Sequence, residues 1–179
     1  MLQELEIWEQ IQFLKSGVLI KLVWSKNGTP NTLTGSADTV EITDLGEKKF
    51  NQCMCHIFKS GSVNYPFTFN NDTGSNYTWR NSNNGGADGT TTSAVKIDLS
   101  PASDDSFNIG YFIGISSEEK LLIEFQCRPV ASGAGTAPGR EEVAGKWANT
   151  SNTVTEIDVT NGGSGDWLVD SNISAIGTD

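Results

Sequence analysis

The sequence has little of what catalysis usually requires. It contains one histidine, His56, and that residue lies inside an apolar, alternating stretch. No nucleophile elbow, phosphate-binding loop, zinc-protease motif or dinucleotide-binding motif is present. Acidic pairs such as Asp104–Asp105 and Glu118–Glu119 lie beside predicted turns, where charges are ordinarily solvated. We therefore predict a protein that is not an enzyme and that holds no cofactor.

Cysteines are also scarce, and their number is odd. Cys53 and Cys55 are two residues apart, so on a strand both would point to one face, and Cys127 stands alone. One histidine and a Cys-x-Cys pair are too few ligands for a structural zinc site. We predict three free, largely buried thiols and folding in a reducing compartment.

Positive charge is the third shortage. The chain has 12 Lys and Arg against 22 Asp and Glu, a net charge of −10. This balance opposes binding to phosphate backbones and to anionic membrane surfaces, so neither nucleic acid nor membrane is an expected partner. No apolar run approaches the ~18 residues of a membrane helix, and the N-terminus lacks the basic start of a secretory signal.

Alternating patterns and turn residues dominate the rest of the sequence. The 19 glycines, with many Asn, Ser and Thr, favour tight turns. Period-two hydrophobic patterns predict strands at 39–43, 53–58, 95–99, 108–115 and 121–128, and weaker ones at 143–148, 153–159 and 167–169. We expect an all-β antiparallel sandwich with a jelly-roll-like arrangement. Its predicted core comprises Val40, Ile42, Ile97, Leu99, Ile113, Ile123 and Phe125.

The first residues differ from the remainder. Leu5, Trp8, Ile11 and Leu14 recur at helical spacing, although a twisted edge strand could bury some of the same stretch. We divide the chain into an N-terminal arm or short helix, residues 1–17, and a single β-sandwich domain, residues 18–179, whose first strand is expected at 18–24. The arm is predicted to pack against a neighbouring subunit.

One polar stretch, FNNDTGSNYTWRNSNNGGADG, allows two interpretations at its start. Asn70, Asp72 and Asn76 alternate as the oxygen ligands of a calcium loop do, which would give a weak calcium site. The alternative is a structural turn in which these side chains bond backbone amides and Gly74 takes a positive φ. We favour the turn, and we expect it to join 65–70 and 76–80 as a hairpin.

The aromatic residues that follow are also ambiguous. Tyr77 and Trp79, with Arg80, Asn83 and Asn84, have the chemistry of a glycan-binding surface, because rings stack on sugars and amides bond hydroxyls. The same aromatic residues could instead close the core of the sandwich. Exposure beside a groove would favour the first interpretation, and burial the second.

Several separated motifs resemble one protein family. F-N-x-D-x-G-x-N-Y at 69–77, GAG-x-AP-x-R-x-E at 133–142 and GKW-x-N-T-S at 145–151 are similar to motifs in small β-rich proteins of tailed phages and marine viruses. The resemblance spans about Asp38 to the C-terminus and implies a virion surface, capsid or tail-associated structural protein. On this basis we expect many copies assembled in the host cytoplasm, with the chain itself and other virion proteins as partners. The alternative is a carbohydrate-binding or receptor-binding module that recognises a host glycan.

Overall fold

The described part of the protein belongs to the all-β class. The computed structural model describes residues 23–61, 63–102, 104–163 and 165–179, and these contain strands and no helix. No helix among them could therefore span a membrane. The 1–17 arm and most of the strand predicted at 18–24 lie outside the described residues.

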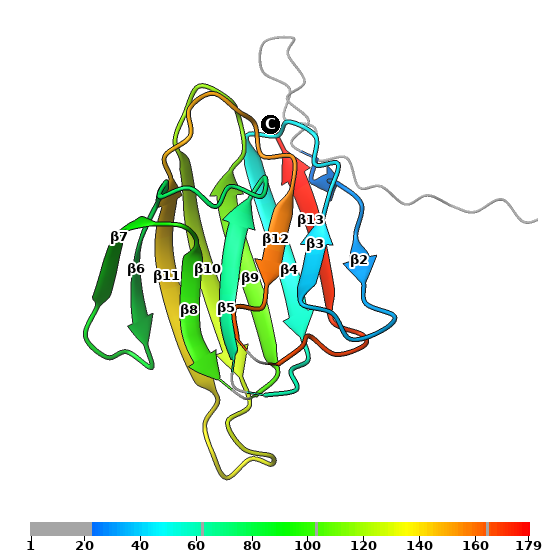
Figure 1. Cartoon of the computed structure of the whole chain (residues 1–179), viewed down its shortest axis with the longest axis vertical. Helices are drawn as coiled ribbons and strands as arrows, with labels where there is room; N and C mark the ends of the chain where they lie inside the picture. The colour runs from blue at the N-terminus through cyan, green and yellow to red at the C-terminus, as the bar shows by residue number, and fades with distance from the viewer. Residues whose placement is uncertain (1–22, 62, 103, 164) are drawn as a thin grey trace, which may run out of the picture.

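Two antiparallel sheets pack face to face as a sandwich (Figure 1). The large sheet has the order β1-β13-β4-β9-β10-β11-β6-β7, with β2 also paired to β13. Its strands are β1 (Ser25–Lys26), β2 (Asn31–Thr32), β4 (Phe50–Ile57), β6 (Tyr77–Asn83), β7 (Gly89–Ala94), β9 (Ser106–Ile113), β10 (Lys120–Arg128), β11 (Gly139–Trp147) and β13 (Asn172–Thr178). The small sheet, in the order β3-β12-β5-β8, contains β3 (Thr39–Ile42), β12 (Ile157–Thr160), β5 (Val63–Phe69) and β8 (Ile97–Ala102). The chain crosses between the sheets at β2–β3, β3–β4, β4–β5 and β5–β6, and again at β7–β8, β8–β9, β11–β12 and β12–β13.

The core lies between the sheets and is rich in aromatic rings. Phe69 of the small sheet contacts Phe112 and Trp147 of the large sheet, with ring centroids 5.1 and 5.6 Å apart. Of the predicted core residues, Val40, Ile42, Ile97 and Leu99 are almost fully buried. The sandwich and this part of its core are confirmed.

The predicted core is wrong on β9 and β10. Ile123 and Phe125 are 54% and 44% exposed, and Ile113 is only half-buried. In their place Leu122, Glu124 and Gln126 point inward, although they form the more polar set of β10. Each strand has two faces, and the more apolar face of β10 points away from the core.

The turn at 70–76 differs from the predicted hairpin. β5 pairs with β12 and β8, whereas β6 pairs with β11 and β7, so this turn carries the chain from one sheet to the other. Asn70 and Asn71 adopt positive φ angles of 53° and 55°, and the positive φ predicted for Gly74 is wrong. Asn tolerates this region better than most residues because its short amide bonds locally.

The end of the chain also differs from the prediction. Trp167 makes isolated bridges to Ala37 and Lys59, and no strand forms at 167–169. The last strand is β13, which pairs with β1, β2 and β4 inside the large sheet. All three cysteines are free thiols, with Cys53 and Cys55 buried as predicted and Cys127 exposed.

Candidate functional site

The residues predicted for a glycan site do not form one surface. The Tyr77 side chain is fully buried, and its hydroxyl lies 3.0 Å from the backbone nitrogen of Phe69, from which it accepts a hydrogen bond. Trp79 is half-buried and packs against the core. Arg80 is exposed and pairs with Asp88 at 3.0 Å. The two aromatic rings thus serve the sandwich, as the second interpretation required.

The two asparagines of that set stabilise a different region. Asn83 accepts a hydrogen bond from Arg128 at 3.4 Å, and Asn84 accepts one from the backbone nitrogen of Arg140 at 2.9 Å. Both asparagines lie at the end of β6 away from Tyr77, about 20 Å along the strand. The structure therefore does not bring the five predicted residues together.

The predicted calcium loop is organised by internal hydrogen bonds. Asp72 Oδ1 accepts from the Gly74 backbone nitrogen, and Asp72 Oδ2 accepts from Trp147 Nε1 at 2.6 Å and from Asn76 Nδ2 at 2.9 Å. Partial burial works against ionisation, but these bonds outweigh it and lower the pKa of Asp72. Asn70 Oδ1 accepts from the backbone nitrogens of Thr155 and Glu156. The prediction of a turn whose side chains bond backbone amides is confirmed.

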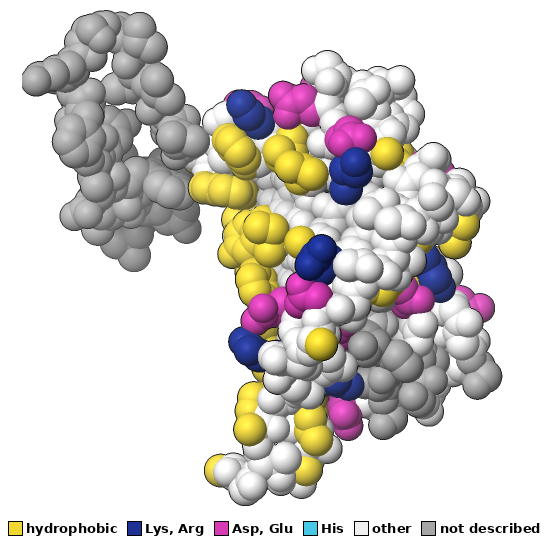
Figure 2. All heavy atoms as spheres, turned by 90° about the vertical axis from the view of Figure 1, so that its left-hand side faces the viewer, with side chains coloured by type: hydrophobic (Ala, Val, Ile, Leu, Met, Phe, Trp, Pro, Cys, Tyr) yellow, Lys and Arg dark blue, Asp and Glu magenta, His cyan; other side chains and the backbone are white. Residues whose placement is uncertain are grey.

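An extensive apolar surface covers the outward side of the large sheet. Large side chains of β4, β9 and β10 lie on it together, because the strands pair Ile123 with Tyr111 and Cys127 with Phe107. We call it the outer apolar face, and it consists of Trp24, Phe50, Phe107, Tyr111, Leu121, Ile123 and Phe125. Figure 2 shows hydrophobic side chains gathered along one side of the molecule. A shallow groove of about 330 Å³ runs between Trp24, Phe50, Tyr111 and Leu121.

The size of this face is unusual for a monomer. Its seven residues are 42–54% exposed. At roughly 200 Å² per large side chain, they leave about 600–700 Å² of apolar area in water. The largest patch on a typical monomer is about 300–600 Å². On the β11 side the apolar residues give way to the Arg140–Glu142 pair at 2.7 Å and to Lys146, which pairs with Glu119 at 3.0 Å. An apolar centre with a charged rim is the usual anatomy of a protein interface.

The inward side of the large sheet holds a buried polar cluster. Gln126 donates to Asn108 at 3.0 Å, and Asn81 donates to Glu141 at 2.6 Å. Glu124 is 3% exposed, and within the described part of the chain its Oε2 has no hydrogen-bond partner. Burial, with a contribution from the charge of Glu141, raises the pKa of Glu124 to about 8. The cavity beside Glu124 has about 10 Å³, enough for one water molecule and far too small for a sugar.

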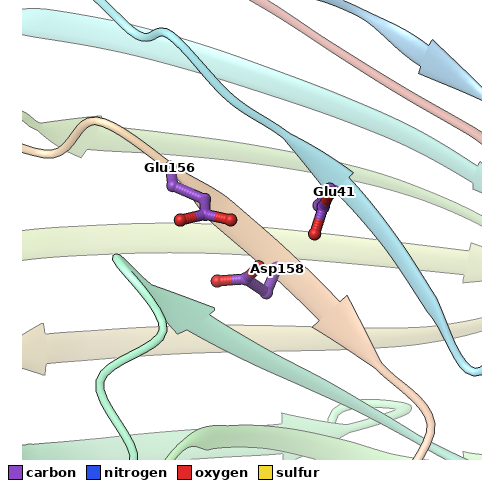
Figure 3. A group of neighbouring side chains, drawn as sticks. All are labelled: Glu41, Glu156 and Asp158. Atoms are coloured by element: carbon purple, nitrogen blue, oxygen red, sulfur yellow. The ribbon is translucent and has the colours of Figure 1, made fainter.

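A third cluster lies on the outward side of the small sheet and consists of Glu41, Glu156 and Asp158 (Figure 3). Burial raises the pKa of Asp158 to about 7, and the neighbouring charge of Glu156 adds to the effect. Sequence reasoning missed this cluster because Glu41 and Asp158 are 117 positions apart in the numbering. A local signal was present in the spacing of Glu156 and Asp158, which places both side chains on one face of a strand.

Comparisons with protein-family models, with curated proteins and with solved structures gave no match to this chain. The outer apolar face and the acidic cluster are therefore interpreted from their own geometry.

Proposed function

We propose that this chain is a non-enzymatic structural protein of a virus particle, present in many copies that contact one another through the outer apolar face. The observation that carries the self-assembly is the orientation of β9 and β10. Both strands turn their more apolar set, which includes Tyr111, Ile123 and Phe125, toward solvent and keep their more polar set inside. A strand gains the most free energy when its apolar side is buried, so this arrangement favours a state in which the face is covered.

The occupant that fits the face is a second copy of the chain. Two such faces would together bury about 1,200–1,400 Å² of apolar area, which reaches the size of a standard stable interface. Every copy of the chain carries the same outer apolar face. Two copies can therefore pair symmetrically through it without another protein. The viral setting rests on the motif resemblance at 69–77, 133–142 and 145–151 and on the acidic, polar remainder of the sequence.

The N-terminal arm is the natural extension of this contact. Trp24, near the start of the described residues, lines the groove of the outer apolar face. Twenty-two residues can extend over about 70 Å, which is enough to reach a neighbouring copy. Their apolar side chains, including Trp8 and Ile11, would supply anchors.

The test is the oligomeric state of the purified chain, measured by sedimentation velocity across a range of concentrations. The wild-type chain is expected to form a defined oligomer, and Ile123→Arg should dissociate it while leaving the thermal unfolding of the sandwich nearly unchanged. Thr92→Arg, on the exposed edge strand β7, is the matched control and should assemble normally. A wild-type chain that stays monomeric at high concentration, or an Ile123→Arg chain that assembles as wild type does, would contradict the proposal.

Two further measurements separate the parts of the proposal. Removing residues 1–15 should leave a folded sandwich that assembles more weakly, and a truncated chain that fails to fold would assign the arm to the core. The viral setting is tested independently by looking for this chain, by mass spectrometry, in purified virus particles. If infected cells make the chain but their purified virus particles lack it, the viral setting is contradicted. The proposed self-assembly would not be affected by that result.

A further inference from the structure

Three carboxylates converge on the outward side of the small sheet. Glu41 comes from β3, Asp158 from the neighbouring strand β12, and Glu156 directly precedes β12 (Figure 3). Val40, Ile42, Ile157 and Val159 point into the core, so the acidic side chains between them point away from it. One carboxylate oxygen from each residue lies within 4.8 Å of the others.

This arrangement places three carboxyl groups side by side. Glu41 and Asp158 are register partners on paired strands, a position in which two negative charges destabilise a sheet. Among the described residues, none of the three carboxylates forms a salt bridge with Lys or Arg. Only Glu41 is well exposed to water, and Glu156 is half-buried.

Asp158 supplies an independent indication of a ligand. It is 2% exposed, and its Oδ2 accepts hydrogen bonds from the Asn71 backbone nitrogen at 3.2 Å and from Thr68 at 3.4 Å. Its Oδ1 is buried and has no hydrogen-bond partner among the residues that the structure describes. Figure 3 shows this carboxylate directed toward Glu156. A buried carboxylate oxygen without a partner is costly unless a cation or a donor satisfies it.

We propose that Glu41, Glu156 and Asp158 form a calcium-binding site. Calcium takes six to eight oxygen ligands at about 2.4 Å, so two ligand oxygens on opposite sides of one ion are about 4.8 Å apart. The observed spread of the three oxygens fits within that limit without any strand moving. An all-carboxylate site selects a hard cation, because softer metals prefer nitrogen and sulfur ligands. Bidentate carboxylates and water molecules on the open Glu41 side complete the coordination.

The same site connects three separate parts of the chain. Asp158 already holds the 70–76 turn through Asn71, and Asn70 bonds the backbone just before β12. A calcium ion bound to Glu41 as well would tie the edge strand β3 to this turn through β12. The ion would therefore bind the native state and raise its stability, since the unfolded chain separates the ligands. This site is distinct from the predicted Asn70–Asp72–Asn76 loop, whose Asp72 carboxylate is fully engaged.

The experiment uses the full-length chain, stripped of metal with a chelator and then titrated with calcium chloride. Isothermal titration calorimetry should give one site per chain with a Kd on the order of 10⁻⁴–10⁻³ M, the range of modestly charged sites. Saturating calcium should raise the Tm by several degrees. Equal concentrations of magnesium should produce a clearly smaller shift, because magnesium demands stricter geometry.

Variants identify the ligands. Asp158→Asn and Glu41→Gln should each weaken calcium binding at least tenfold and abolish most of the Tm shift. Glu41→Gln alters an exposed side chain, so it keeps the test valid if Asp158→Asn folds poorly. Asp88→Asn removes an exposed carboxylate elsewhere and should bind as wild type does. The proposal is overturned if calcium neither binds nor shifts the Tm, if Glu41→Gln keeps the full response, or if magnesium is equally effective.

Discussion

Replacing Glu124 by Gln should make the protein more stable at neutral and alkaline pH. Glu124 is buried between the sheets, where the charge of Glu141 acts on it and the thiols of Cys53 and Cys55 line the same cavity. Ionising such a carboxyl group costs free energy because water is excluded. Gln has nearly the same shape and cannot ionise, so it removes this cost while preserving the packing.

The sign and size follow from proton linkage. The pKa of Glu124 is about 8 in the folded chain against 4.5 for the ordinary side chain. Between these values the folded state keeps a proton that the unfolded state has lost, so the free energy of unfolding falls as pH rises, by up to ~1.4 kcal/mol per pH unit. The stability contributed by the protonated form is complete below about pH 4.5 and is lost by about pH 8. Over three pH units the loss is roughly 4 kcal/mol.

Urea unfolding at about pH 5, 6, 7 and 8 measures how the free energy of unfolding depends on pH. Tryptophan fluorescence reports the unfolding, since Trp147 and Trp167 are buried in the folded chain. Glu124→Gln should match the wild type near pH 5 and exceed it by about 2–4 kcal/mol near pH 8. Glu142→Gln, on the solvent side of β11, is the matched control and should follow the wild-type curve. Parallel curves for the wild type and Glu124→Gln across this range would refute the argument, because other titrating groups, Asp158 included, are common to both proteins.

The remaining predictions concern packing, the turn and the thiols. Ile157→Ala should lower the free energy of unfolding by about 2–5 kcal/mol in urea titrations, because the side chain is fully buried. Ile123→Ala should lower the free energy of unfolding of the monomer by under about 1 kcal/mol. A larger loss would mean that the outer apolar face is buried within one chain. Asp72→Ala should lower the Tm by removing acceptors for the turn, at a cost of about 1–2 kcal/mol, and an unchanged Tm would show that the turn holds without them. In the native monomer a thiol reagent should modify Cys127 quickly and the two buried thiols slowly, with three thiols reacting after denaturation; one reactive thiol after denaturation would reveal a disulfide.

The alternation of residues in the sequence was enough to predict the class of the fold. A period of two over 39–43 or 121–128 specifies a strand whatever its partners are, because side-chain direction alternates in any extended chain. The small-sheet core at Val40 and Ile97 was predictable for a related reason, since each of these residues lies on the clearly more apolar face of its strand. The side-chain hydrogen bonds of the 70–76 turn were also predictable, because Asn and Asp cap backbone amides locally.

The same local rules failed for β13. Its inward residues, Ile173, Ala175 and Gly177, are small or interrupted by polar neighbours, so the stretch has no strong apolar signal. It is a strand because β4 on one side and the two short strands β1 and β2 on the other satisfy its backbone. Backbone pairing of this kind depends on which strands become neighbours in the fold. The residues of a single strand do not specify those neighbours.

Tertiary structure alone decided which face of β10 is inside and which carboxylates are neighbours. Alternation defines two faces but does not orient them, and in β10 the position of the small sheet placed Glu124 in the interior and Ile123 in solvent. Glu41 and Asp158 are remote in sequence and become register partners only when β3 pairs with β12. The outer apolar face and the acidic cluster therefore both arise from strand pairing and sheet packing. Local sequence sets the direction of each side chain, whereas contacts between distant segments determine its neighbours.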